Sequence, residues 1–400
     1  MATAGLMAPL MKSYTIDGNK QIVWGIYEEF VRRMEHKGGA IHPSCISTGT
    51  SLTGFLTFGQ DHITPFNPET FKLVADELVR ENSIRVFFHG QFIDTICDGG
   101  CISKILITDK SGIRAIQGKQ FIDCSGDADV AVKAGVPYVL GDGYGNMQPA
   151  TTMFRVSNVA TEKTRRYVEE HPEDFMFINL AQKAREAGDF PINRRRAIIF
   201  ETPYPGQWVI NSTRVQQFNG TDADQRSEAE MEGRRQVEIV VNYLRKYIPG
   251  FENALLMDSG NEIGARETRH IEGKYMLTIE DVMSGKHFED CIAISGFPMD
   301  IHDNKGTADL FEQPKDINFY EIPYRCMVPK KIENLLVAGR PVSATHQAAG
   351  AVRVMPTCFA MGQAAGIAAA LSFENYCSVQ NLDITALHEA LVEAGACLGL

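Results

Sequence analysis

The chain has 400 residues, with 39 Lys and Arg against 50 Asp and Glu, a formal net charge of −11 and 44% hydrophobic residues. This composition is typical of a globular protein with a core large enough for one or two domains. The acidic balance argues against nucleic acid or an anionic membrane as the main partner, because both need a basic surface. No run reaches the about 18 apolar residues that span a bilayer. The longest candidate, residues 359–371, is interrupted by Gln363.

The nine cysteines have no regular spacing, which favours reduced thiols over a disulfide framework. Cys97 and Cys101 flank Asp98-Gly99-Gly100, a hairpin-turn signal. No second pair of ligands follows at zinc spacing, so no metal is expected. The N-terminal residues lack the positively charged segment of a signal peptide, and we therefore expect a cytoplasmic protein.

In chain order, the first clear element is a helix over residues 67–81, with Asn67 as its cap and Pro68 at its first position. Three β-rich runs follow, at residues 84–96, 101–109 and 113–124, separated by glycine-containing turns. The last run gives way to Ser125-Gly126-Asp127 and then to a helix-like segment, residues 128–134.

Residues 135–226 are irregular and rich in glycine, proline and aromatic side chains, which favours a sheet with long loops. A long amphipathic helix is predicted over residues 227–247, acidic at its start, basic at its end and stopped by Pro249-Gly250. Residues 333–338 predict a short buried strand, and residues 356–371 a helix. Small residues recur along this helix at three- and four-residue spacing, so its backbone can approach a sheet or a flat ligand closely.

Two junctions in this sequence carry small residues where a strand meets a helix, at residues 124–127 and 353–357. Free N–H groups and the positive end of a helix dipole favour a phosphate or an anionic ring at such places. Each junction alone is equally compatible with tight strand-to-helix packing.

Five segments together resemble the FAD-dependent oxidoreductases with a glutathione-reductase-like or fumarate-reductase-like flavin fold. These are residues 121–138 (FIDCSGDADVAVKAGVPY), 262–282 (EIGARETRHIEGKYMLTIEDV), 299–302 (MDIH), 321–329 (EIPYRCMVP) and 334–371, which contains RVMPTCFAMGQAAG. The resemblance implies an α/β fold with a discontinuous FAD-binding domain, residues 1–135 and 326–400, and an inserted α+β substrate domain, residues 136–325.

Members of that family begin with a strand, a G-x-G-x-x-G turn and a helix that hold the FAD pyrophosphate. This sequence opens at Met1-Ala2-Thr3-Ala4-Gly5-Leu6, which is similar to the segment after that unit, and no G-x-G-x-x-G occurs elsewhere in it. We therefore expect the 400-residue form to bind FAD weakly and an upstream extension to restore tight binding.

The resemblance also assigns cofactor contacts. It places the flavin ring near Met1, Ala2 and Thr3, the adenosine end near Phe92 and Ile93, and a phosphate or ribose contact at Cys124, Ser125, Gly126 and Asp127. Gly339 and Arg340 would approach the pyrophosphate, and Arg353, Met355, Pro356 and Thr357 the pyrimidine edge of the ring. For Arg340 and Arg353 the alternative is a surface salt bridge.

Catalytic candidates come from four polar side chains. Arg266 and Arg269 lie three apart and, on one helix face, would form a fork for a substrate carboxylate; the alternative is a structural ion-pair network. His302 alternates with Asp300 as on a strand, which suits a proton relay or, more simply, a polar strand edge. His346, in a glycine- and alanine-rich stretch, is the strongest candidate for a general acid or base.

The expected activity is hydride transfer between flavin and a small organic substrate, with a carboxylate as a candidate substrate group. We expect FAD as cofactor, a small-molecule substrate, and neither nucleic acid nor membrane as partner. Modification of a larger substrate such as a tRNA base fits the net charge poorly. A flavin-free binding or scaffold protein is the alternative from another class, and the visible absorption of the purified protein separates the two.

Overall fold

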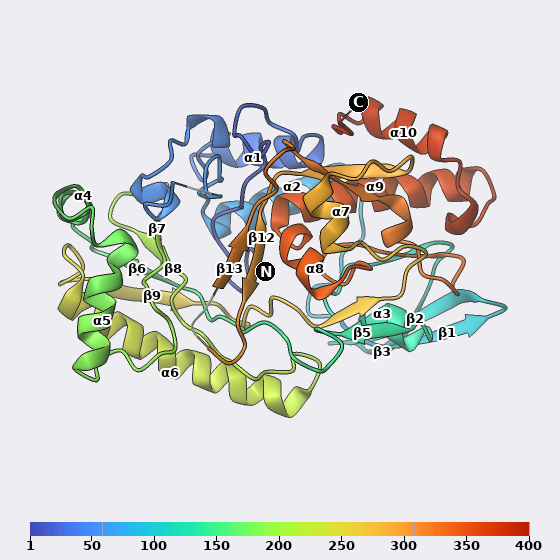
Figure 1. Cartoon of the computed structure of the whole chain (residues 1–400). Coiled ribbons are helices and arrows are strands. Elements are labelled where there is room, and N and C mark those ends of the chain that lie inside the picture. Colours follow the sequence, from blue (N-terminus) through green and yellow to red (C-terminus); the bar gives the residue numbers. More distant parts are fainter. Residues whose placement is uncertain (58, 307–308, 400) are drawn as a thin grey trace.

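A computed structural model describes residues 1–57, 59–306 and 309–399. The fold is mixed α/β. Figure 1 shows a four-stranded sheet with helices α4, α5 and α6 at one end of the molecule and a three-stranded sheet, β1 to β3, at the other. The β12–β13 hairpin and helices α8 and α9 lie between them. Residues that are far apart in the sequence therefore meet in the middle of the molecule.

The N-terminal region contributes α1 (Ile26–His36) and α2 (Pro68–Glu81). The predicted helix at residues 67–81 is confirmed, because the Asn67 side chain accepts hydrogen bonds from the backbone N–H groups of Glu69 and Thr70. Such a cap satisfies donors that the first turn of a helix leaves unpaired.

Strands β1 (Gln91–Asp98), β2 (Cys101–Asp109) and β3 (Gly112–Gln117) form an antiparallel meander. The turn at Asp98-Gly99-Gly100 is confirmed, and all nine cysteines are free thiols.

Two predictions for this region are wrong. Residues 84–90 are not a strand, and His89 there has a φ of 57°, which extended backbone excludes. The run at residues 113–124 divides into β3 and β4 (Phe121–Asp123), because β4 pairs in parallel with β15 (Leu335–Val337) instead of continuing the meander.

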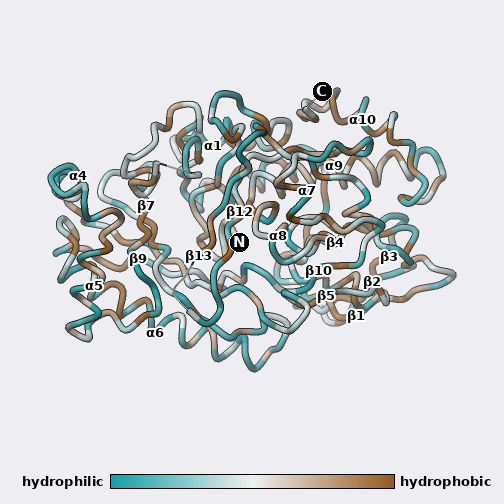
Figure 2. The backbone as a smooth tube through the Cα atoms, in the orientation of Figure 1, coloured by the Kyte–Doolittle hydropathy of each residue, from teal (hydrophilic) through white to brown (hydrophobic). Residues whose placement is uncertain are grey.

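The middle of the chain builds the four-stranded sheet. Its order is β7 (Ile199–Glu201), β8 (Trp208–Ile210), β6 (Phe154–Ser157) and β9 (Leu255–Ser259), and α4 (Thr161–Glu170), α5 (Ile178–Glu186) and α6 (Ala223–Tyr247) accompany it. Helix α6 begins four residues before its predicted start, because the Asp222 side chain caps it at Gln225 N. Its buried face, with Val237, Val240 and Leu244, joins the core around Trp208, and Figure 2 shows how hydrophobic segments gather there.

Short elements complete this part. Helix α3 (Asp129–Lys133) follows β4, and β5 (Tyr138–Leu140) pairs with β10 (Arg269–Ile271). Helix α7 (Ile279–Ser284) begins with a capping box between Thr278 and Asp281. Strand β11 (Cys291–Ser295) pairs with β14 (Tyr320–Pro323), and β12 (Met299–His302) pairs with β13 (Asp309–Glu312).

Three helices, α8 (His346–Val352), α9 (Met355–Glu374) and α10 (Ile384–Glu393), end the described chain. Helix α9 extends the predicted helix at both ends. By length and composition alone it could cross a membrane, but the core helix of a soluble protein passes the same test. In this fold α9 packs against β11, α1 and α10, and part of its surface faces a cavity.

Candidate functional site

A cavity of about 1080 Å³ opens where the N-terminal segment, the end of β4, the end of β15 and helix α9 meet. Ten of the predicted cofactor residues line it: Met1, Ala2, Thr3, Cys124, Ser125, Gly126, Gly339, Arg340, Arg353 and Met355. These residues come from four separate parts of the chain. That they bind the cofactor stays a prediction, but the fold brings them to one place.

The α9 wall of the cavity has open space at two of its glycines, between larger lining residues such as Phe359 and Ile367. A Cβ atom added at Gly362 or Gly366 would meet no other atom within 4 Å. Cavities that hold small molecules and cofactors are typically about 300–1,000 Å³. The volume of this one, about 1080 Å³, suits an extended cofactor better than a small metabolite alone.

Arg340 is held at the cavity wall by two partners. Its Nη2 donates to Asp127 Oδ1 at 3.0 Å, and its Nη1 donates to the Ala265 carbonyl. Both charged side chains of this pair are largely buried, with exposed fractions of 14% and 11%. Arg340 is therefore not the surface salt bridge that the sequence left open.

Gly126 makes room for this guanidinium. Its φ is +85°, and a Cβ there would lie 2.5 Å from Arg340 Nη2. We expect Gly126→Ala to lower the free energy of unfolding by about 2 kcal/mol, since the backbone is strained and Arg340 must move. Gly145→Ala is the matched control, because its φ is +87° and nothing lies within 4 Å of its Cβ. Equal losses for both variants in urea unfolding would show that only backbone strain matters.

The remaining cofactor candidates do not line the cavity. Phe92 and Ile93 lie on β1 in the meander. Pro356 and Thr357 lie in the first turn of α9 and are buried on the side facing β11, where Thr357 Oγ1 donates to Ser295 Oγ at 3.1 Å. Their predicted contacts with flavin gain no support from this placement.

His346 is paired with a buried carboxylate that the sequence did not single out as its partner. It is the first residue of α8, and its Nδ1 lies 2.8 Å from both carboxylate oxygens of Glu267. His270 Nε2 lies 3.1 Å from Glu267 Oε1, and Gln148 N donates to Oε2 at 3.2 Å. No local spacing pointed to this pair, because Glu267 lies in an extended segment and is 79 residues from His346.

The pKa values of Glu267 and His346 are shifted in opposite directions from their ordinary values. Burial alone would raise the pKa of Glu267, but the hydrogen bonds from His270 and His346 outweigh it and hold that pKa at about 2. Burial opposes the charging of His346, yet the bond to Glu267 raises the pKa of that imidazole above its ordinary value. With Nδ1 engaged by Glu267, Nε2 is the nitrogen left to exchange a proton with a ligand.

Arg266 and Arg269 do not form the predicted fork. The segment is extended, leading into β10, so the helix face that the prediction required does not exist. Arg266 is buried, and its Nη1 donates to Pro149 O at 2.6 Å and Thr151 Oγ1 at 2.7 Å. Arg269 Nη1 instead donates to Asp127 O at 3.0 Å and Asp129 Oδ1 at 2.9 Å. Arg269 is thus a structural ion-pair residue beside α3.

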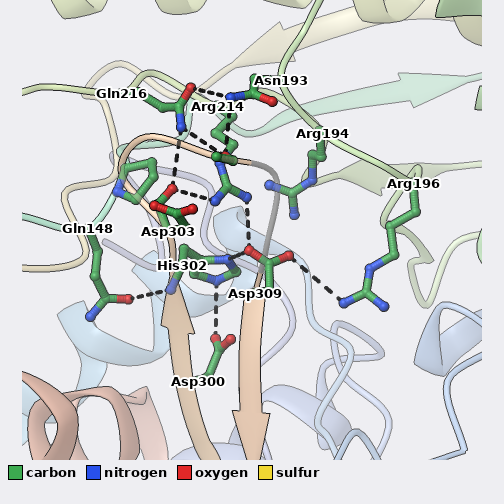
Figure 3. Close-up of polar contacts among 12 residues, drawn as sticks. Gln148, Asn193, Arg194, Arg196, Arg214, Gln216, Asp300, His302, Asp303 and Asp309 are labelled. Carbon is green, nitrogen blue, oxygen red and sulfur yellow. Dashed lines mark hydrogen bonds and ion pairs between the residues drawn. The ribbon is translucent and has the colours of Figure 1, made fainter.

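His302 lies between two carboxylates in the β12–β13 hairpin (Figure 3). Its Nδ1 is 2.6 Å from Asp309 Oδ1 and its Nε2 is 3.3 Å from Asp300 Oδ2. Arg353 Nη2 donates to Asp300 Oδ2 at 3.1 Å, and Arg214 Nη1 donates to Asp309 Oδ1 at 2.8 Å. Burial opposes ionisation of both aspartates, but His302 and these arginines hold the pKa of each carboxyl well below its ordinary value. A chain of side-chain contacts therefore runs from the cavity-lining Arg353 through Asp300, His302 and Asp309 to Arg214.

The sequence profile of the FAD dependent oxidoreductase family matches residues 1–391. The chain belongs to this family. No curated protein sequence matches it. Solved structures show similarity over part of their length, and the following three are among them. The flavin-dependent brominase Bmp2 matches with 12% identity over 83% of this chain and 60% of its own, at a TM-score of 0.36.

The other two structures are an L-proline dehydrogenase from P. horikoshii and a geranylgeranyl bacteriochlorophyll reductase-like protein from Thermoplasma acidophilum. The first has 9% identity over 80% of this chain and 58% of its own, at a TM-score of 0.34. The second has 10% identity over 82% and 59%, at a TM-score of 0.37. This chain therefore spans about 60% of the length of these proteins.

FAD is the cofactor of the family, and the cavity residues fit it in three respects. The small-residue face of α9 leaves room for a flat ring, and the volume suits an extended molecule. Arg340 and Arg353 supply positive charge for its anionic groups. Arg353 Nε is buried and has no hydrogen-bond partner among the described residues, so this guanidinium is not fully paired within the protein.

Proposed function

We propose that the protein transfers a hydride between a small organic substrate and FAD held in the α9 cavity. The observation that carries this proposal is the convergence of residues 1–3, 124–126, 339–340 and 353–355 on one cavity whose α9 wall is open at two glycines. When bound, FAD supplies the hydride chemistry, and the protein supplies orientation and electrostatics.

The chain's own residues have separate tasks in this proposal. Met1, Ala2, Thr3 and the glycines of α9 bound the space for the ring, while Gly339 and Arg340 approach the phosphates. The first turn of α9 carries no acidic residue, so its positive end and Arg353 favour an anionic reduced ring. His302 holds Asp300, which in turn fixes the Arg353 guanidinium at the cavity wall.

His346 is proposed as the acid or base that moves a proton at Nε2, with Glu267 fixing the ring orientation through Nδ1. Arg266 is proposed to bind a substrate carboxylate, since it is buried and, within the described residues, donates hydrogen bonds to the neutral oxygens of Pro149 and Thr151. Burial and the neighbouring Arg353 and Arg194 lower the pKa of Arg266 to about 9, which an anion nearby would reverse.

The first test is the absorption spectrum. The purified chain is titrated with FAD while flavin absorption and fluorescence are followed, and the loaded sample is then titrated anaerobically with a reductant. Because the sequence lacks the G-x-G-x-x-G unit, we expect weak but saturable binding and a bound flavin whose spectrum bleaches and recovers in air. A protein that folds but binds no flavin at any FAD concentration would favour the binding or scaffold alternative.

The second test is Arg266→Lys. We expect the variant to fold and keep its flavin but to lose at least about 100-fold in kcat/KM, because a point charge cannot reproduce a two-pronged contact with a carboxylate. Arg269→Lys is the control, since Arg269 is engaged by Asp127 and Asp129, and its turnover should be nearly unchanged. An Arg266→Lys variant that is stable and fully active would remove Arg266 from the substrate site.

A further inference from the structure

Arg194 is buried and incompletely paired. Its exposed fraction is 2%. Among the described residues, Nε and Nη2 have no hydrogen-bond partner, and Nη1 makes one long contact of 3.5 Å to Thr213 O. A guanidinium withdrawn from water without a counter-charge is strongly destabilising. Asp309 and Asp300 act on its charge electrostatically, but among the described residues no carboxylate accepts a hydrogen bond from its Nε or Nη2, so an anion that accepts from these two atoms would complete its pairing.

Arg194 lies close to Arg196, Arg214 and Asp309 (Figure 3), and the arginines around it outnumber the carboxylates. The arginines that act electrostatically on one another here are Arg194, Arg196, Arg214, Arg266 and Arg353. Among the described residues, the carboxylates that act on Arg194 and Arg266 are Asp300 and Asp309. Asp300 is engaged by His302 and Arg353, and Asp309 by His302, Arg214 and, at 4.0 Å, Arg196. Two carboxylates shared among five guanidiniums leave positive charge uncompensated.

The unsatisfied polar atoms of this cluster are all donors. Besides the two nitrogens of Arg194, they include Arg353 Nε and Gln148 Nε2. The other end of the Gln148 amide is engaged, because its Oε1 accepts from His302 N. Water would satisfy these donors but would leave the charge uncompensated, whereas an anion does both. Nε and Nη2 lie on one side of the guanidinium, where their N–H groups can donate two parallel hydrogen bonds to the two oxygens of a carboxylate.

We propose that Arg194, through Nε and Nη2, binds the carboxylate of an organic acid that is the substrate of this protein. This assignment rests on the proposed function, because the link to the reaction runs through Arg353, which belongs to this cluster and also lines the FAD cavity. Arg194 replaces Arg269 as the partner of Arg266, since Arg269 is already paired. The recognised group is planar and singly charged, which distinguishes it from phosphate.

Thermal unfolding with added anions tests this assignment. Acetate, malonate, inorganic phosphate and chloride are titrated against the wild-type chain at constant ionic strength. We expect acetate or malonate to raise the Tm and chloride to leave it unchanged. In Arg194→Gln the apparent affinity for the carboxylate should fall at least about 10-fold, while the Tm without anion should not fall, because an uncompensated buried charge is removed.

Arg194→Lys keeps the charge but not the planar fork, so it should lose carboxylate affinity by a similar factor even if the glutamine variant folds poorly. Arg234→Gln, on the exposed side of α6, is the control and should bind the carboxylate as the wild type does. Equal stabilisation of the wild type and both Arg194 variants, or stabilisation by phosphate alone, would overturn the assignment. If the wild-type chain binds the carboxylate through Arg194 but does not bind FAD, only the proposed function is refuted.

Discussion

Replacing Glu267 by glutamine is expected to lower the free energy of unfolding at pH 7 by about 3 kcal/mol. The Glu267 carboxylate is fully buried and bonded to His346 and His270, so its replacement leaves both imidazoles beside a neutral amide that is a weaker acceptor. Urea unfolding of the wild type and the variant measures the difference. Glu238→Gln, at an exposed position of α6, is the control and should unfold within about 0.5 kcal/mol of the wild type.

The same pair predicts a pH dependence. The folded pKa of Glu267 is about 2, below its ordinary 4.5, so its stabilisation is present above pH 4.5 and is lost as the pH falls towards 2. The folded pKa of His346 is raised, so its stabilisation is complete below its ordinary 6.5 and is lost as the pH rises through the folded value. The wild type should be most stabilised by this pair between about pH 4.5 and 6.5. A Glu267→Gln variant that keeps the wild-type pH profile would contradict this.

Filling the α9 cavity should abolish cofactor binding without harming the fold. Gly366→Leu is expected to weaken FAD binding at least about 100-fold, because a leucine side chain would project into the space that the ring needs. The free energy of unfolding should stay constant or rise by up to about 1 kcal/mol, since leucine favours a helix more than glycine does. Fluorescence titration of FAD and urea unfolding measure the two quantities.

Ala370→Leu provides the control for that prediction. Ala370 is exposed on the same helix and does not line the cavity, so its replacement should leave FAD affinity unchanged. If Gly366→Leu binds FAD as tightly as the wild type, the glycine face of α9 is not the flavin site. A fall in affinity for both variants would point to a general effect on α9.

The chain by itself determined the elements whose signals are local. Helix α2 follows from Asn67 and Pro68, because a cap and a first-turn proline act within four residues of each other. The same holds for the Asp98-Gly99-Gly100 turn and for helix α9, which has Pro356 in its first turn. The segments quoted from residues 121–371 were also enough to recognise the family that the match over residues 1–391 shows.

Contacts between distant segments were decided only by the tertiary structure. The division of residues 113–124 into β3 and β4 depends on pairing with β15, more than 200 residues away along the chain, and no local pattern encodes that partner. Spacing suggested a fork of Arg266 and Arg269, but their extended backbone sends one to Thr151 and the other to Asp129. Helical periodicity applies only where a helix forms.

The electrostatics of the site likewise depended on burial. Glu267 and His346 are 79 residues apart, and Arg194 showed in the sequence only as part of a short basic run. These side chains are functional candidates because they are buried. Glu267 is buried beside its histidine partners, and Arg194 is buried without a hydrogen-bonded carboxylate among the described residues. The free energy of a buried charge depends on that environment more than on its sequence neighbours. The sequence therefore determined which chemistry-bearing residues exist and the family they belong to, while packing decided which of them are paired, which are strained and which still need a ligand.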